Sequence, residues 1–595
     1  MHDDAMIGKM GTKDKMTEKE RLKKLIDTGM GRQQADLCIK NAKVVDVFNL
    51  DIFESNIYIS DGYIAGFGDD GFPEAKETYD AKGAYIAPGL IDAHVHIESS
   101  HLSPCGFSSI VVPHGTTTII ADPHEICNVC GLDGFDYMLE TSKNIALNVL
   151  FQVPSCVPAT PFENAGAELG PGEIAARIGD PGVLGLGELM NYVGACGADS
   201  LILDKIMTAR SAGKIIDGHS PRVLGKDLDA YTACGVRSDH ECTTPEEAVA
   251  KIRRGMYVFL REGTLCRDEQ TLLPAVRGDA FRFCAFCTDD RQVMSILSEG
   301  HIDNNVRIAI QNGIDPVKAV CMGSVNAATC YGLDDRGAVA PGRRADLILL
   351  DDLYSFNVKK TWICGKLAAS DGKYLAEDIH VSAEVVCGRM NVKGFGRDRL
   401  ALKLSSDWAK AISLIPDSII TGIENVSVAR DSNSCWIRNS EDVVKIAVVE
   451  RHKGTGNVGL GLLSGLGLKG GAIASTIAHD SHNIIVAGDS DEDMGAAVKC
   501  LIEMGGGQVV VKKGKVLAKV CHEIAGLMSD RKAEEMADEM RNAIDLARSE
   551  LSVSCVKDPF MALCFMALPV IPSLKITDMG LFDVEKFCHI SVDAD

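Results

Sequence analysis

Two histidines one residue apart close the apolar stretch Leu90-Ile91-Asp92-Ala93-His94-Val95-His96-Ile97-Glu98. In an extended strand alternate side chains share a face, so His94 and His96 point the same way. An imidazole pair at this spacing suits a borderline divalent ion such as zinc, manganese or ferrous iron. The same pair also fits a polar strand end, so its interpretation depends on the rest of the chain.

The size and charge of the chain narrow the class of protein. Its 595 residues are too many for one hydrophobic core, so about three domains are expected. No apolar run is long enough to span a bilayer, and Met1 to Arg21 has no apolar signal-peptide core, so we expect a cytoplasmic protein without a membrane partner. The net charge of −22 argues against a nucleic-acid partner and favours a small neutral or cationic ligand.

The 21 cysteines indicate reduced thiols in a chain without an export signal. Two Cys-x-x-Cys pairs, Cys127/Cys130 and Cys284/Cys287, raise the alternative of a four-thiolate zinc site. The pairs lie far apart in sequence, and Cys284 and Cys287 fall in an apolar strand-like run where they would face opposite ways. Buried thiols are therefore the expectation.

The first residues of the chain predict a helix followed by a small sheet. Residues 17–33 read as a short charged helix that ends at Gly29 or Gly31. Short strand-like segments with turn signals follow, which predicts a small antiparallel sheet, and a β-rich stretch resumes after Gly337. We infer that these two stretches complete one β-sandwich-like module, with the intervening residues inserted as a separate domain. The expected units are an N-terminal helical extension (1–33), the β module (34–88 and 337–390), the inserted domain (89–336) and a C-terminal domain (391–595).

The inserted domain alternates apolar strand-like runs with segments of helical periodicity. Eight strands that alternate with helices predict a parallel (β/α)₈ barrel. Thr244, Pro245 and Gly255 mark the start and end of one connecting helix. The expected strands are 89–96, 116–122, 146–153, 183–188, 214–219, 236–240, 256–260 and 281–289.

Active-site groups of such barrels lie at the C-terminal ends of the strands. Here those ends carry metal-ligand side chains, with His124 just past the second strand. Four imidazoles and two carboxylates exceed the needs of one tetrahedral ion, so two metals are expected, with Glu188 as their bridge. Asp289 would bind one metal and stand beside the bound water. The six candidate ligands are His94, His96, Glu188, His219, His240 and Asp289.

The order of these ligands resembles the amidohydrolase superfamily. Longer strings are similar to the bacterial adenine deaminases within it, and the similarity covers nearly the whole chain, including a C-terminal domain that most amidohydrolases lack. Glu188 stands where related enzymes often use a carboxylated lysine. The strings are Ile91-Asp92-Ala93-His94-Val95-His96-Ile97-Glu98-Ser99-Ser100, Ala121-Asp122-Pro123-His124-Glu125-Ile126, Gly187-Glu188-Leu189-Met190-Asn191, Asp217-Gly218-His219-Ser220-Pro221, Ser238-Asp239-His240-Glu241 and Cys287-Thr288-Asp289-Asp290.

The resemblance implies hydrolysis of adenine to hypoxanthine and ammonia, a step of purine salvage, through a metal-bound hydroxide that attacks C6. It implies two ions per chain, Mn²⁺ or Fe²⁺ with Zn²⁺ as an alternative, and catalytic roles for Asp289 and Glu188. Asp289 would take a proton from the hydroxide and deliver it to the departing amino group. A separate acid must donate to the ring nitrogen beside C6, and Glu98, His124 and Glu125 remain open alternatives. Large barrel enzymes with appended domains commonly self-associate, so a homo-oligomer is expected.

Two other functions stay open at this point. Another amidohydrolase, such as an N-acetylglucosamine-6-phosphate deacetylase or a cyclic-amide hydrolase, would share the barrel, but a deacetylase needs basic residues for its phosphate and usually holds one metal. A non-catalytic scaffold on the same barrel would have lost ligands, whereas this chain has all six.

The C-terminal region reads as α+β. Strands are expected at 427–429, 443–449 and 509–511, a hairpin turn at Lys513-Gly514, and a helix near 531–551. The six glycines of 459–471 lack the ending of a phosphate-binding loop, so we expect flexible packing turns there.

The string His479-Asp480-Ser481-His482-Asn483 also stands out in this region. It fits a third metal site, a structural turn, or a lid over the barrel mouth. Our hypothesis is the lid, because water must be excluded around a bound purine, and His479 then joins Glu98, His124 and Glu125 as a candidate substrate-binding residue.

Overall fold

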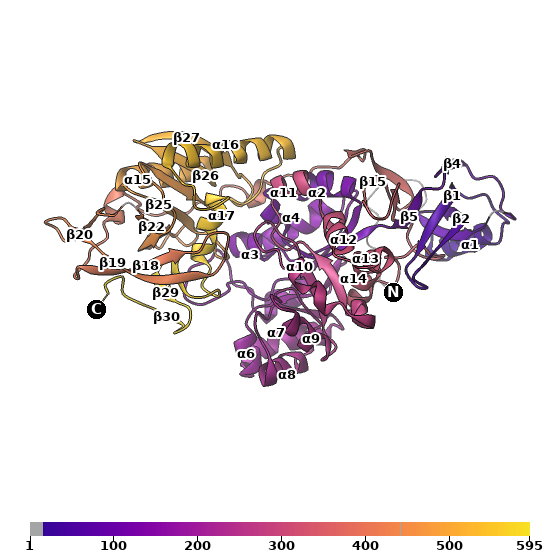
Figure 1. Ribbon diagram of the computed structural model, residues 1–595, viewed down its shortest axis with the longest axis horizontal. Coiled ribbons are helices and arrows are strands. Elements are labelled where there is room, and N and C mark those ends of the chain that lie inside the picture. Colours follow the sequence, from indigo (N-terminus) through magenta and orange to yellow (C-terminus); the bar gives the residue numbers. More distant parts are fainter. Residues whose placement is uncertain (1–15, 69, 441, 595) are drawn as a thin grey trace.

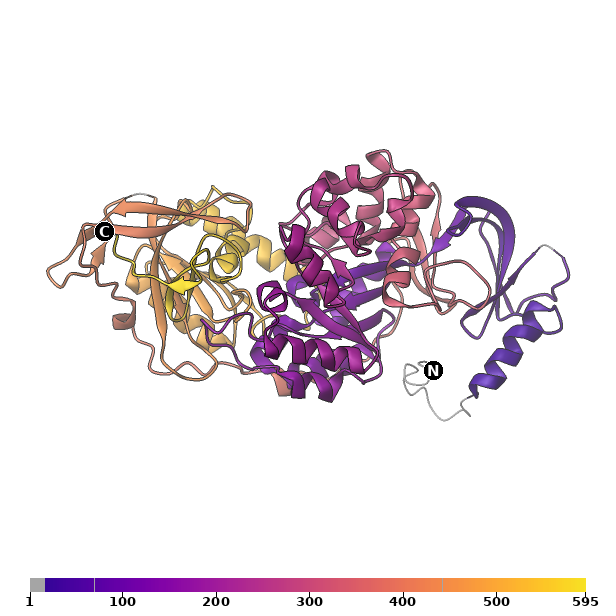
Figure 2. The ribbon, with the colours of Figure 1, turned by 90° about the horizontal axis from the view of Figure 1, so that it is seen from below.

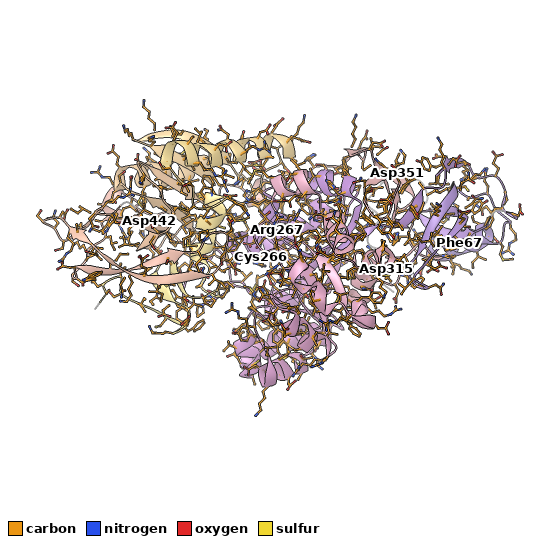
Figure 3. All side chains as sticks on the ribbon, in the orientation of Figure 1. Phe67, Cys266, Arg267, Asp315, Asp351 and Asp442 are labelled. Atoms are coloured by element: carbon orange, nitrogen blue, oxygen red, sulfur yellow. The ribbon has the colours of Figure 1, made fainter. Side chains whose placement is uncertain are left out.

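The computed structural model describes residues 16–68, 70–440 and 442–594. The parts of the molecule lie in a row, with an N-terminal sheet at one end, a barrel in the middle and a C-terminal unit at the other end (Figures 1 and 2). Figure 3 marks the two ends by Phe67 in the N-terminal sheet and Asp442 in the C-terminal unit. No helix among these residues is long and apolar enough to cross a membrane.

The central barrel has eight parallel strands in the described part of the chain, as predicted. The strands form two arcs, β6 to β10 and β11 to β13, and isolated parallel bridges join the arcs at Val95 with Asp289 and at Ile216 with Val236. The final strand is shorter than predicted, because residues 278–283 form a 3₁₀ helix before it. The strands are β6 (Leu90–Val95), β7 (Thr116–Ala121), β8 (Asn148–Val153), β9 (Val183–Leu189), β10 (Ile215–Gly218), β11 (Ser238–Asp239), β12 (Tyr257–Arg261) and β13 (Cys284–Cys287).

Helices follow the barrel strands and cover the outside of the barrel (Figure 2). The predicted cap of α9 is confirmed, because the Thr244 side chain accepts the backbone N–H of Glu247 and Pro245 is the first helical residue. The helices are α2 (Pro104–Val111), α3 (His124–Cys130), α4 (Leu132–Ser142), α5 (Pro171–Arg177), α6 (Tyr192–Cys196), α7 (Ser200–Ser211), α8 (Gly225–Ala233), α9 (Pro245–Ile252), α10 (Glu269–Leu272), α11 (Val293–Glu299), α12 (Ile302–Gln311), α13 (Pro316–Met322) and α14 (Val325–Tyr331).

All 21 cysteines are free, and both Cys284 and Cys287 are buried in β13.

The N-terminal sheet is built from both sides of the barrel sequence, because β14 pairs antiparallel with β5. The expectation of a purely antiparallel sheet is wrong, since β1 runs parallel to both β4 and β5. The chain crosses the sheet between β3 and β4 and so reaches the far side of β1. Helix α1 (Glu18–Gly29) ends where predicted and packs against β3. The strands are β1 (Leu37–Asp46), β2 (Asp51–Ser60), β3 (Tyr63–Phe67), β4 (Glu77–Asp80), β5 (Tyr85–Pro88), β14 (Leu347–Leu350), β15 (Val358–Ile363), β16 (Lys366–Ser370) and β17 (Lys373–Tyr374).

The C-terminal unit has a mixed sheet in the order β19-β18-β23-β22-β25-β24-β26-β27. Helix α15 (Asp491–Met504) packs on the face that carries Val509 and Val511, and α16 (Ala533–Leu551) packs on the face that carries Val510. The predicted strands at 443–449 and 509–511, the turn at 513–514 and the helix near 531–551 are confirmed. The strands of this sheet are β18 (Trp408–Leu414), β19 (Thr421–Ser427), β22 (Val443–Val449), β23 (Val458–Ser464), β24 (Ala472–Ser475), β25 (Ile484–Gly488), β26 (Gly507–Lys512) and β27 (Lys515–Cys521).

Two predictions for this unit are wrong in detail. The strand expected at 427–429 is interrupted, because β19 ends at Ser427 and the chain then pairs with Ile437 from Ala429 onward. The glycine-rich segment is a strand in its first half, β23, and not a turn. The remaining elements are β20 (Ala429–Arg430), β21 (Trp436–Ile437), α17 (Pro559–Cys564), β28 (Leu574–Thr577), β29 (Gly580–Asp583) and β30 (Cys588–His589).

Candidate active site

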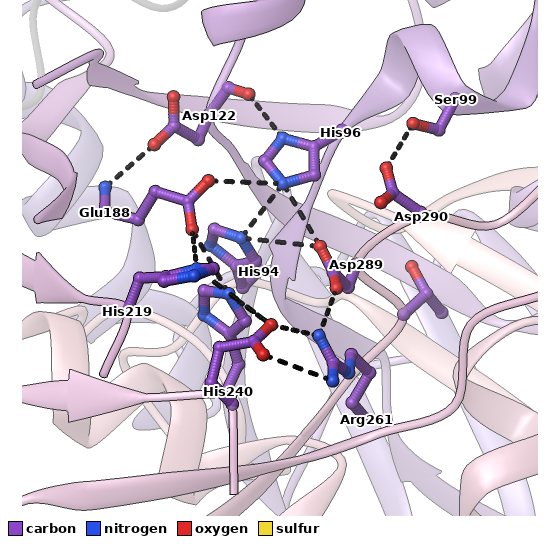
Figure 4. A network of polar contacts seen from close by, with 12 residues as sticks. His94, His96, Ser99, Asp122, Glu188, His219, His240, Arg261, Asp289 and Asp290 are labelled. Carbon is purple, nitrogen blue, oxygen red and sulfur yellow. Dashed lines mark hydrogen bonds and ion pairs between the residues drawn. The ribbon is translucent and has the colours of Figure 1, made fainter. Parts of the chain in front are cut away.

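The six predicted ligands converge at one end of the barrel (Figure 4). His94 lies in β6 and His96 directly after it, Glu188 lies in β9, and the other three follow β10, β11 and β13. All of them are buried except His219, whose side chain keeps 13% of its surface exposed. The expectation that these side chains meet at the C-terminal ends of the barrel strands therefore agrees with the structure.

Three of the ligands form one half of the cluster. The Nε2 atoms of His94 and His96 lie 3.2 Å apart, and Asp289 Oδ1 lies 3.1 Å from His96 Nε2 and 3.9 Å from His94 Nε2. The other half is formed by Glu188 Oε2, which lies 2.7 Å from His219 Nδ1 and 3.2 Å from His240 Nε2.

Glu188 connects the two halves, because its second carboxylate oxygen lies 3.6 Å from His96 Nε2. A single carboxylate that faces both groups of imidazoles has the arrangement expected of a bridging ligand.

Hydrogen bonds behind the cluster fix the ring orientations. His96 Nδ1 lies 2.8 Å from the backbone carbonyl of Asp122, which can only accept, so Nδ1 carries the proton and Nε2 presents its lone pair to the cluster. His94 Nδ1 lies 3.4 Å from Asp217 Oδ2, a contact without hydrogen-bond geometry. The carboxylate of Asp122 accepts the backbone N–H of Glu188 at 2.8 Å. Such contacts orient ligands before an ion arrives.

The charges of the cluster fit divalent cations. Burial alone would raise the pKa of the Glu188 carboxyl, but His219 and His240 hold it well below its usual range. The pKa of Asp289 is likewise lowered against the effect of burial, by the neighbouring His96 and Arg261. Two buried carboxylates and four imidazoles whose nitrogens point inward form a donor set that suits zinc, manganese or ferrous iron.

Arg261 belongs to the site although the sequence analysis missed it. It is the last residue of β12, it is buried, and its Nη1 donates to Asp289 Oδ2 at 2.8 Å. It also pairs with Glu241 and, at 2.9 Å, with Asp268. The predicted strand ended one residue earlier, at Leu260. Because active-site groups lie at the C-terminal ends of barrel strands, a prediction that extended the strand to residue 261 would have included Arg261 as a candidate.

A pocket opens beside the cluster and carries a second missed residue, Asp290. Asp290 lines the pocket together with Glu98 and Ser99, and Ser99 Oγ donates to the Asp290 carboxylate. Glu98 Oε1 accepts the backbone N–H of Ile126 at 3.1 Å, whereas its buried Oε2 has no hydrogen-bond partner among the described residues. Burial raises the pKa of Glu98 to about 7.

His124 lies between the ligand cluster and the C-terminal unit. Its Nδ1 is 3.2 Å from Glu188 Oε1, and its Nε2 is 3.5 Å from Glu125 Oε1 and 4.0 Å from Asp480 Oδ1. It is buried and close enough to His96 and Glu188 to be a further metal ligand.

Glu125 joins α3 of the barrel to the predicted lid segment. Its Oε1 lies 2.7 Å from His479 Nδ1, and its Oε2 accepts from His482 Nε2. His482 Nδ1 accepts the backbone N–H of Ala478 at 3.2 Å, so Nε2 must carry the proton of the neutral ring. A protonated Nε2 does not bind a metal, and we therefore interpret Glu125, His479 and His482 as a hydrogen-bonded clamp between the two domains.

Comparison with known proteins finds family matches for both the barrel and the C-terminal unit. Residues 85–368 match the amidohydrolase family, and residues 418–588 match the adenine deaminase C-terminal domain. An adenine deaminase of Nitratidesulfovibrio vulgaris is 48% identical over 97% of this chain and 100% of its own length. The chain belongs to the adenine deaminase family.

Other members of the adenine deaminase family match to the same extent. Adenine deaminase 2 of Desulfotalea psychrophila is 49% identical and the adenine deaminase of Ligilactobacillus salivarius is 47% identical, each over 97% of this chain and 100% of its own length. The matches extend through the barrel and the C-terminal unit, so both belong to the family architecture.

Proposed function

We propose that this protein is an adenine deaminase, which converts adenine and water into hypoxanthine and ammonia. The observation that carries the proposal is the convergence of four imidazoles and two carboxylates beside a pocket with buried carboxyl groups. The names of the relatives that match over their full length support adenine as the substrate. We favour this function over the deacetylase, cyclic-amide hydrolase and scaffold alternatives.

Two ions per chain are part of the proposal, Mn²⁺ or Fe²⁺ with Zn²⁺ as an alternative. His94, His96 and Asp289 would hold one ion and His219 and His240 the other, with Glu188 shared between them. When bound, the ions supply Lewis-acid chemistry that makes water a nucleophile near neutral pH.

Asp289 is the proposed proton carrier. The pairing with Arg261 holds its carboxylate ionised, so it can accept a proton from the attacking water. The same proton then goes to the amino nitrogen, because the C6–N bond breaks only when ammonia, and not its anion, departs. Glu188 contributes by contacting both groups of ligands, which fixes their positions relative to each other.

Glu98 is the proposed donor to the ring nitrogen beside C6, and the second proton of the attacking water returns to its carboxylate when the C6 carbonyl forms. Of the three alternatives, Glu125 already uses both carboxylate oxygens in the clamp, and His124 faces Glu188. Glu98 lines the pocket and keeps its buried Oε2 free for substrate. We assign His124, Glu125 and His479 to shaping the substrate site.

The remaining expectations are proposals of the same kind. The 21 free thiols support a reducing compartment, which favours a cytoplasmic location. We also propose that the protein forms a homo-oligomer and has no nucleic-acid or membrane partner. The proposed domain boundaries lie at residues 33, 88, 336 and 390.

The test is ammonia release from adenine, adenosine, 6-chloropurine and guanine by protein loaded with Mn²⁺ or Fe²⁺, with metal counted per chain. Rapid turnover of free adenine with about two ions per chain supports the proposal. Turnover of none of the purines, with a single ion, contradicts it and favours a deacetylase or cyclic-amide hydrolase.

A further inference from the structure

We propose that the C-terminal domain forms one wall of the adenine pocket, and that Phe565, stacked on His479, is the surface against which the purine ring lies. This inference rests on the proposed function and assigns the domain a part in substrate recognition. It makes Phe565 a substrate-binding residue more than 270 residues away in sequence from Asp289.

The pocket beside the ligand cluster is shared between two domains. The barrel contributes polar groups, Glu98, Ser99 and Asp290, and the C-terminal domain contributes Phe560 and Phe565 from α17 and the 3₁₀ turn that follows it. Polar groups together with an aromatic wall are the combination that a flat heterocycle with ring nitrogens requires.

The aromatic wall has a defined plane. The rings of His479 and Phe565 are stacked with centroids 4.8 Å apart and an interplanar angle of 19°. Both side chains are buried and both line the pocket. Aromatic side chains presented in this way bind purine bases by stacking, which tolerates different bases because each has a π face.

Contacts on both sides keep this wall in place. Glu125 of the barrel holds His479 through Nδ1 at 2.7 Å, so the stack is tied to the domain that carries the ligand cluster. Behind Phe565, the buried Lys575 Nζ donates to the Phe565 carbonyl at 3.0 Å and to the Ile419 carbonyl at 2.7 Å. A wall fixed before substrate binds spends little binding energy on ordering.

The test compares two buried phenylalanines of the same domain. Phe565→Leu removes the ring from the pocket wall, whereas Phe582→Leu removes a ring of equal size that does not line the pocket. For the metal-loaded full-length protein, KM and kcat are measured with adenine, and the Kd of hypoxanthine is measured by calorimetry. The Kd does not depend on turnover.

Loss of stacking predicts that Phe565→Leu raises KM and Kd about 10-fold with kcat within about 3-fold, while Phe582→Leu leaves all three near wild type. KM and Kd of Phe565→Leu within about 2-fold of wild type would overturn the inference. If Phe565→Leu does not fold, Phe565→Met, whose flexible unbranched side chain can fill the space without a ring, takes its place with the same two outcomes. If wild-type protein neither binds nor converts a purine, the proposed function itself fails.

Discussion

The carboxylate of Asp122 accepts the backbone N–H of Glu188 at 2.8 Å, and the backbone carbonyl of Asp122 accepts a hydrogen bond from the His96 ring. One residue at the end of β7 therefore orients two proposed ligands that stand on different strands. The arrangement depends on the absence of a side chain at residue 187, because a Cβ there would lie 2.2 Å from Asp122 Oδ2.

Gly187→Ala is expected to displace the Asp122 carboxylate and release Glu188 from its position. Loss of such an orienting contact lowers metal affinity or activity by about 10- to 100-fold. The measurement is metal content per chain together with adenine turnover. Gly172→Ala is the matched control, since nothing lies within 4 Å of its added Cβ, and it should keep both values. Wild-type metal content and turnover in Gly187→Ala would show that the Asp122 contact does not position Glu188.

A buried ion pair supports the loops that carry His219 and His240. Lys251 Nζ donates to Asp239 Oδ2 at 2.7 Å and to the Ser220 carbonyl at 2.7 Å, and both side chains of the pair are fully buried. Lys251→Met leaves the Asp239 charge buried without its partner, which should lower the free energy of unfolding by about 3–5 kcal/mol.

Denaturant unfolding of the metal-free protein measures this change. Lys251→Met combined with Asp239→Asn should recover most of the loss, because no charge is then left buried. Lys226→Met, on the exposed side of α8, should stay within about 0.5 kcal/mol of wild type. An unchanged stability of the single Lys251→Met variant would contradict the account.

The attachment of α1 is expected to depend on pH. Burial would raise the pKa of Asp36, but hydrogen bonds from Lys24 and Lys76 outweigh it and lower the pKa to about 2. Because the folded pKa lies below the unfolded value of about 3.9, the stabilisation is complete above that value and is lost as pH falls towards about 2. The Asp36 and Lys24 side chains are only half-buried and the Lys76 side chain is exposed, so solvent screening reduces the contribution to about 1 kcal/mol.

The difference in unfolding free energy between wild type and Asp36→Asn measures this contribution. It should be about 1 kcal/mol at about pH 7 and shrink by about pH 3. A difference that stays constant over this range would mean that the Asp36 charge does not stabilise the fold.

Glu98→Gln tests the proposed donor to the ring nitrogen. The amide fills the same space but has no acidic proton to transfer, so kcat for adenine should fall by about 10²- to 10⁴-fold. Because Glu98 stands outside the ligand cluster, metal content should remain at the wild-type value. If kcat is retained, proton donation must come from another group, and Asp290, which lines the same pocket, becomes the candidate.

The sequence was sufficient for the barrel and for the convergence of the candidate ligands, because both follow from local patterns. Apolar runs predicted the strands, and the positions at the ends of these runs predicted which side chains meet at one end of the barrel. The edge strand β4 was missed because Glu77 to Asp80 are mostly polar and exposed. The glycines of β23 were read as turns, although Gly459 serves close packing: a Cβ there would lie 1.9 Å from the Thr577 carbonyl.

The pocket wall was beyond sequence reasoning for a different reason. Glu125 and His479 are 354 residues apart, and no periodicity relates a helix of the barrel to a loop of the C-terminal unit. The string around His479 was noticed, but only the tautomer of His482 distinguishes a clamp from a metal site. Phe565 carried no signal, because a phenylalanine in an apolar segment is ordinarily a core residue.

The measurement that tests the central claim most directly is the conversion of adenine by the metal-loaded protein and by Asp289→Asn, with hypoxanthine, ammonia and metal content determined on the same samples. The account predicts equal amounts of hypoxanthine and ammonia from wild type, and a loss of at least about 10³-fold in kcat for Asp289→Asn while metal remains bound. Adenine left unchanged by the metal-loaded wild type, or converted equally well by Asp289→Asn with its metal in place, would contradict it.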